Sequence, residues 1–249
     1  MRLLEPLTPD PRAPLAYAHP LAKIGAAFVC MLALFLTIDL VTPTLVLLAE
    51  IAAVPLMGVP PRALGRRALP LFVAAAGIGF FNALLSANIP GGVAIALRVV
   101  GIALAGIVAL ASIDPTELAD ALVEHLHVPR RFTVGALAAF RLMPLFADEW
   151  QTIALARRAR GIESAGPLAR IAGFAPMTRS LLVAAIRRAT RLALAMDGRG
   201  FADPGCRTLA RPRAITARDW SLVAAALAVA VIAYAVSLEL GTWRFFLGR

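Results

Sequence analysis

Two arginines in this sequence sit in the same local pattern, and their type and spacing suggest a specific chemistry. Arg160 lies in the stretch 156–161 and Arg199 lies in 195–200, and both stretches read Ala-x-x-x-Arg-Gly. A planar guanidinium can donate paired hydrogen bonds to a carboxylate or to backbone carbonyls of another protein. Two similar arginines, 39 residues apart, would suit a partner with two similar pockets.

Helix capping is the alternative interpretation of the same pattern. Arginine is favourable at a helix C-terminus, and a glycine just beyond it takes the left-handed conformation that ends the helix. Capping explains either stretch alone, but it explains less well why the pattern recurs. The residues by themselves leave both interpretations open.

The sequence offers no other group that predicts chemistry. Lys23 is the single lysine and has no Gly-rich phosphate loop around it, so we expect no ATP site in this chain. His125 and His127 would point to different sides of a helix, which argues against a metal pair. Cys30 and Cys206 lie in unrelated surroundings. We therefore expect no metal, no cofactor and no catalytic activity.

Composition places these arginines in a membrane protein. Of the 249 residues, 60% are hydrophobic, and the mean hydropathy of +0.79 is well above that of a soluble domain. The net charge of +10 lies beside apolar runs of membrane length, which favours orientation in a membrane over nucleic-acid binding. We expect five transmembrane helices, over residues 22–38, 44–59, 69–87, 93–113 and 220–240.

The distribution of basic residues predicts the orientation. Segments 1–23, 60–68 and 114–219 hold 22 of the 25 Lys and Arg residues, so we expect them on the cytoplasmic side. The predicted fold is an all-α, polytopic membrane protein in three parts. Four transmembrane helices occupy 1–113, cytoplasmic helices occupy 114–219, and the last transmembrane helix with a short tail occupies 220–249.

The cytoplasmic segment reads as several amphipathic helices. Asp114 followed by Pro115 and Glu117 is a strong helix start. We expect one long helix over 130–161, kinked near Pro144, and two further helices. Those two are predicted over 168–174 and 177–197. Four apolar residues mark the helix faces that would meet membrane lipid or a partner: Leu118, Leu122, Leu137 and Phe140.

Two charges fall inside the predicted spans. Glu50 lies about 9 Å below the outer end of its run, and Arg98 lies about 7.5 Å below the outer end of another. Buried charges in a membrane usually find a partner. Their similar depth predicts an ion pair between the two helices; the alternative is that each faces water or the interface separately.

At the two arginine stretches the chain resembles the transmembrane T component of energy-coupling factor transporters. Ala159-Arg160-Gly161 matches the first of two short motifs of that family. Gly198-Arg199-Gly200 resembles the second, with Gly198 where alanine is usual. Further similar stretches are His19–Lys23, Asp114–Leu118, Val128–Phe132 and Arg141–Pro144.

The resemblance implies a subunit of an uptake system for vitamins or transition metals in the bacterial plasma membrane. It would join two cytoplasmic ABC ATPase subunits to a substrate-binding membrane protein, the S component. By analogy the motif residues Ala159, Arg160, Gly161, Arg199 and Gly200 contact the ATPases. The same analogy assigns Leu118, Leu122, Leu137 and Phe140 to the contact with the S component.

Three other classes fit less well. A permease of a conventional ABC importer would carry one short coupling helix where this chain has about a hundred cytoplasmic residues. A membrane enzyme would need converging polar residues, and a secondary carrier would show a repeat of its spans. The permease is the strongest of these alternatives.

Overall fold

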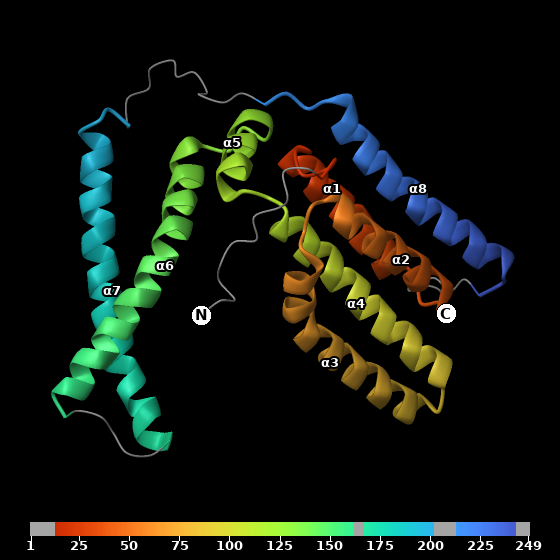
Figure 1. Ribbon diagram of the computed structural model, residues 1–249, viewed down its shortest axis with the longest axis horizontal. Helices are drawn as coiled ribbons and strands as arrows, with labels where there is room; N and C mark the ends of the chain where they lie inside the picture. Colours follow the sequence, from red (N-terminus) through yellow and green to blue (C-terminus); the bar gives the residue numbers. More distant parts are fainter. Residues whose placement is uncertain (1–12, 162–166, 202–212, 243–249) are drawn as a thin grey trace. The chain divides into compact units, whose positions relative to one another are not determined.

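The computed structural model describes residues 13–161, 167–201 and 213–242, and this part of the chain is all-helical (Figure 1). The predicted fold class is therefore confirmed. The described helices are α1 (Pro20–Leu36), α2 (Val41–Leu56), α3 (Pro61–Ser86), α4 (Ile89–Ala111), α5 (Pro115–His125), α6 (Arg130–Ala159), α7 (Pro167–Asp197) and α8 (Ala217–Glu239).

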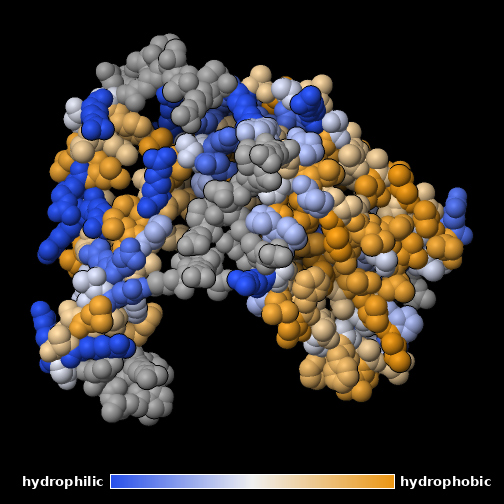
Figure 2. All heavy atoms as spheres, viewed as in Figure 1, coloured by the Kyte–Doolittle hydropathy of each residue, from blue (hydrophilic) through white to orange (hydrophobic). Residues whose placement is uncertain are grey.

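The apolar runs of the sequence form the helices expected of them. Three described stretches are long and apolar enough to cross a membrane: Ala68–Ser86 within α3, α4 and α8. The helices α1 and α2 are equally apolar but shorter, with 17 and 16 residues. Hydrophobic surface accordingly covers these five helices, whereas α6 and α7 carry many hydrophilic residues (Figure 2).

The chain divides into two compact units. The first comprises Met1–Leu126 and Pro212–Arg249, and the second comprises His127–Arg211. Helix α5 thus packs with the apolar helices, and α6 and α7 form the second unit. This division follows contacts within the protein, whereas the three-part division of the sequence follows the membrane, so the membrane topology stays a prediction.

Small residues let α3 and α4 approach closely in the first unit. A Cβ built on Gly92 would lie 2.5 Å from the carbonyl oxygen of Gly79, and a Cβ on Gly79 would lie 2.8 Å from that of Gly92. A third glycine, Gly101, faces the buried Leu34 of α1 at a similar distance. Such contacts are the usual way in which membrane helices pack.

Helix α8 is hydrogen-bonded near both of its ends to residues that flank α1. At its N-terminus, Asp219 accepts a hydrogen bond from the backbone N–H of His19 at 2.5 Å. At its C-terminus, Ser237 donates to the carboxylate of Asp39 at 2.7 Å. Between them, Tyr234 donates to the carbonyl of Ala33 at 2.8 Å. The residues that form the first two hydrogen bonds are all buried: His19, Asp219, Asp39 and Ser237. These contacts therefore fix the register of α1 against α8.

In the second unit, α6 and α7 pack on each other. Arg188 of α7 donates to Glu149 of α6 at 3.2 Å and lies over the ring of Phe146. Trp150 packs against Phe174 with ring centroids 5.3 Å apart. Helix α7 is continuous, so the expected break between two helices over 168–174 and 177–197 is wrong.

Candidate functional site

Arg160 directly follows the last residue of α6 and caps that helix. Its backbone N–H donates to the carbonyls of Ala156 and Arg157, at 3.3 and 3.2 Å. Gly161 then donates to Arg158 at 2.9 Å and adopts a left-handed φ of +69°. The predicted end of this helix at Gly161 is thus confirmed to within two residues.

The second stretch ends α7 in the same way. Gly200 donates to the carbonyl of Asp197 at 2.9 Å, with a φ of +73°, and Phe201 donates to Met196 at 3.0 Å. This pair of bonds is the Schellman cap that glycine permits after a helix. The two stretches therefore share a backbone geometry as well as a sequence pattern, and capping by the glycines is confirmed.

The caps leave the arginine side chains available. Arg160 and Arg199 are exposed, and no hydrogen bond or ion pair joins either side chain to a residue in the described part of the chain. A Cβ built on Gly161 or Gly200 would meet nothing within 4 Å. Both arginine side chains are thus exposed at helix ends in the described part of the chain, where a second protein could reach the guanidinium.

The two sites lie at opposite ends of the α6–α7 pair (Figure 1). The two helices cross, with α6 ending at one extremity of the second unit and α7 ending at the other. The 31 residues of α7 correspond to about 46 Å of helix. One helix pair therefore presents two similar arginines that are far apart, which suits two separate pockets better than one.

The four apolar residues expected to meet a second membrane protein fall in two places. Leu118 and Leu122 lie on α5 of the first unit, where they are half-buried. Leu137 and Phe140 lie on α6 of the second unit, where Leu137 is half-buried and Phe140 is 59% exposed. Of the four, Phe140 offers the most uncovered apolar surface.

In the described part of the chain no hydrogen bond joins Glu50 to Arg98, and the ion pair expected between them stays a prediction. Arg98 donates to the carbonyl of Phe35 near the end of α1 and lies over that residue's ring. Both carboxylate oxygens of Glu50 are buried and have no hydrogen-bond partner within residues 13–161, 167–201 and 213–242. Depth along the helices was estimated from the sequence, but the direction in which each side chain leaves its helix depends on how the helices pack.

Lys23 is buried, although a long basic side chain near a helix end usually extends to the interface. Its ammonium donates to the carbonyls of Ala16 and Ser112, each at 2.8 Å. Ser112 caps α4, so the charge is placed at the negative end of that helix. The lysine thus ties α1 to α4 and has no phosphate-binding surroundings.

Arg213 is a contact residue that the sequence did not reveal. It forms an ion pair with Glu117 of α5 at 2.8 Å, and it also donates to the backbone carbonyl of Tyr17 and, from its main chain, to Glu124. These partners lie 89 to 196 residues away in the sequence, so spacing gave no signal. Arg213, which lies shortly before α8, thus connects its segment to α5 and to the residues before α1.

A pair of histidines lies next to this contact. The rings of His19 and His125 are 4.8 Å apart between centroids. Burial lowers the pKa of His19, and the neighbouring His125 lowers it further. In the part of the chain that the structure describes, no three His, Cys, Asp or Glu side chains form a metal site. Cys206 lies outside the described residues.

Comparison with known proteins connects these features to a family. Residues 12–208 match the family model CbiQ, described as cobalt transport protein. Three relatives are each named energy-coupling factor transporter transmembrane protein EcfT. The one from Limosilactobacillus fermentum is 34% identical over 158 residues, 60% of this chain and 58% of the relative. The relative from Bacillus subtilis is 28% identical over 166 residues, which are 63% of this chain and 62% of the relative.

The relative from Staphylococcus aureus is 35% identical over 120 residues, 44% of each chain. These alignments span about half of the relatives' length. The family match extends over most of the chain, including both arginine stretches, and it confirms the resemblance to energy-coupling factor T components. The chain therefore belongs to the CbiQ family.

Proposed function

We propose that this chain is the transmembrane coupling subunit of an energy-coupling factor uptake transporter. It would join two cytoplasmic ABC ATPase subunits to a substrate-binding S component and would have no catalytic role of its own. The observation that carries the proposal is the repeated cap, in which Arg160 and Arg199 stand exposed on equivalent backbone turns. The names of the relatives support the same assignment.

Each arginine would enter a groove of one ATPase. A guanidinium forks onto carboxylates or carbonyls with defined geometry, so it transmits both position and direction. The adjacent glycine, with Ala159 at the first site, would let the partner backbone approach closely. Because α6 and α7 are joined by the contacts of Glu149 and Arg188, a change in distance between the two ATPases would change how the helices cross.

Movement of these helices would then act on the S component. The exposed ring of Phe140 and the neighbouring Leu137 offer an apolar surface on α6, and Leu118 with Leu122 offer one on α5. Apolar contacts are non-directional and permit sliding. The proposed substrates are vitamins or transition-metal ions, taken up across a bacterial plasma membrane with the N-terminus and residues 114–219 cytoplasmic.

The test is co-expression of the chain with its candidate ATPases and S component, followed by purification through a tag on this chain. We compare the wild type with the double variant Arg160→Ala, Arg199→Ala. The matched control is Arg179→Ala, Arg191→Ala, which removes the same charge from exposed positions of α7. The proposal expects the first variant to lose the ATPases or ATP-dependent uptake, and the control to keep both.

If both double variants bind and couple like the wild type, the arginines serve as helix caps and the coupling proposal is wrong. Uptake by this chain and ATPases without any S component would instead favour a conventional ABC permease that lines its own substrate path. The two failures are distinguishable, because the first concerns ATPase retention and the second concerns the substrate route.

A further inference from the structure

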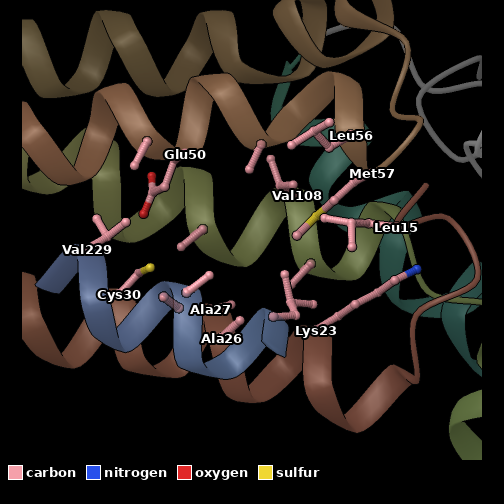
Figure 3. A pocket seen from close by; sticks show the side chains of 17 residues that line it. Leu15, Lys23, Ala26, Ala27, Cys30, Glu50, Leu56, Met57, Val108 and Val229 are labelled. Carbon is pink, nitrogen blue, oxygen red and sulfur yellow. The ribbon is translucent and has the colours of Figure 1, made fainter. Parts of the chain in front are cut away.

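A partly open cavity of about 210 Å³ lies in the first unit between α1, α2, α4 and α8 (Figure 3). Its wall consists mainly of small apolar side chains, contributed by all four helices. Larger residues at these positions would close the space. The lining alanines are Ala26, Ala27, Ala49, Ala53, Ala105, Ala109, Ala225 and Ala226.

A single acid points into this space. Glu50 is 8% exposed, and neither of its carboxylate oxygens has a hydrogen-bond partner among the residues that the structure describes. Figure 3 shows the carboxylate directed between the helices, near the thiol of Cys30. Lys23 also lines the cavity, but its ammonium donates to two backbone carbonyls and does not meet Glu50.

This arrangement is costly when the cavity is empty. Burying a carboxyl group without a hydrogen-bond donor costs free energy, and burying it in ionised form costs much more. Besides the Cys30 thiol, which is only a weak donor, and the Lys23 ammonium, which donates elsewhere, the lining offers apolar groups, so no strong donor in the described part of the chain meets the carboxylate. A ligand that supplies a cationic donor at one end and apolar surface along the rest would satisfy both parts of the wall.

We propose that the cavity binds a small amphipathic ammonium compound. Its charged nitrogen donates to Glu50, and its hydrocarbon part lies against the alanines and Val108, Met57 and Val229. Apolar cavities of about 150 Å³ are known to hold a benzene molecule, so this one has room for on the order of eight non-hydrogen atoms. The inference concerns this chain alone and does not depend on coupling to an ATPase.

Binding is tested on the purified full chain in lipid nanodiscs. The probe is n-hexylammonium, with 1-hexanol and hexanoate as neutral and anionic molecules of the same chain length. Binding is followed by saturation-transfer NMR and titration calorimetry. The wild type should bind the ammonium compound at least about tenfold more tightly than the alcohol, because a hydrogen bond to a charged group contributes about 1.5–3 kcal/mol.

Glu50→Gln keeps the volume of the side chain and removes its charge, so it should abolish the preference for the ammonium probe over the alcohol. Glu239→Gln is the matched control, since it removes a carboxylate from the exposed end of α8 outside the cavity. This control should bind as the wild type does. It also corrects for partition of the probe into lipid.

Ala226→Leu provides a second variant that leaves Glu50 in place and fills the cavity. It should weaken binding of both the ammonium probe and the alcohol. The proposal is overturned if the wild type binds the two equally, if Glu50→Gln retains the preference, or if Ala226→Leu binds the ammonium probe as the wild type does.

Discussion

Gly161 and Gly200 adopt the same left-handed backbone conformation, with φ of +69° and +73°, directly after Arg160 and Arg199. A side chain with a branched Cβ is strained there, at a cost of about 1–3 kcal/mol. The turn that follows each arginine therefore depends on glycine, and so does the direction in which the arginine leaves its helix.

We accordingly expect Gly161→Val and Gly200→Val to lower retention of the ATPases while the arginines remain in place. Gly198→Ala is the control, because its Cβ would meet the Leu194 carbonyl oxygen no closer than 3.4 Å and alanine favours the helix. Pull-down of the ATPases measures the difference. Unchanged retention by Gly200→Val would show that the cap does not position Arg199.

The contact between Gly79 and Gly92 predicts a stability effect in the membrane helices. Gly92→Ala places a methyl group against backbone and side-chain atoms of α3, an overpacking that costs about 1–3 kcal/mol. Gly77→Ala, on the same α3, would meet nothing within 4 Å and should leave stability unchanged or slightly higher. The midpoint of thermal unfolding in one detergent compares the two. Equal midpoints would contradict the close packing.

Asp219 should be sensitive to loss of its charge. Its two oxygens accept hydrogen bonds from His19, from the backbone of Thr216 and from the Thr216 hydroxyl. In Asp219→Asn one oxygen becomes a donor that faces other donors, so we expect a loss of about 1–3 kcal/mol in the free energy of unfolding. Denaturant titration of this variant is compared with Glu239→Gln, whose carboxylate is exposed. Equal denaturation midpoints for the two variants would show that the contact between Asp219 and His19 contributes little to the free energy of unfolding.

His19 predicts a pH dependence of stability. Its pKa is lowered from 6.5 by burial first and by His125 next, while Asp219 and Glu124 act in the opposite direction. A folded-state pKa below the unfolded one means that the unfolded chain binds the proton more readily. The contribution of neutral His19 to the free energy of unfolding is therefore present above about pH 6.5. It is lost as the pH falls through the lower pKa that His19 has in the folded state.

Unfolding midpoints between pH 7.5 and 5 measure this effect. His19→Asn keeps a residue that can cap α1 but removes the titrating group, so its midpoint should fall less steeply with acid than that of the wild type. Parallel curves for the two proteins would exclude His19 as the source of the dependence.

The sequence predicted those features that local chemistry determines. Asp114 caps α5 through the N–H of Thr116, as its position before Pro115 suggested. Both arginine stretches end helices, because the glycine after each arginine adopts the left-handed conformation that closes a helix. The apolar runs predicted the order of the apolar helices. In lipid, the backbone N–H and C=O groups of such a run must hydrogen-bond to each other, and a helix pairs them within the run.

Other features depend on packing, and the sequence did not reveal them. Helix α7 continues through Pro176, although a proline normally weakens a helix, so the break expected there did not occur. Arg98 and Lys23 each donate to backbone carbonyls, which leave no mark in a sequence pattern. The cavity beside Glu50 arises from alanines on four helices, and none of those stretches is unusual alone.

The contacts between α1 and α8 also bear on how the chain is made. His19 and Asp219 are 200 residues apart, and Asp39 and Ser237 are 198 apart. At about 5–20 residues per second, a ribosome needs roughly 10–40 s to synthesise the intervening chain. Helix α1 therefore lacks its contacts with α8 during that interval, and Asp39 stays without its Ser237 donor until the chain has been synthesised as far as Ser237.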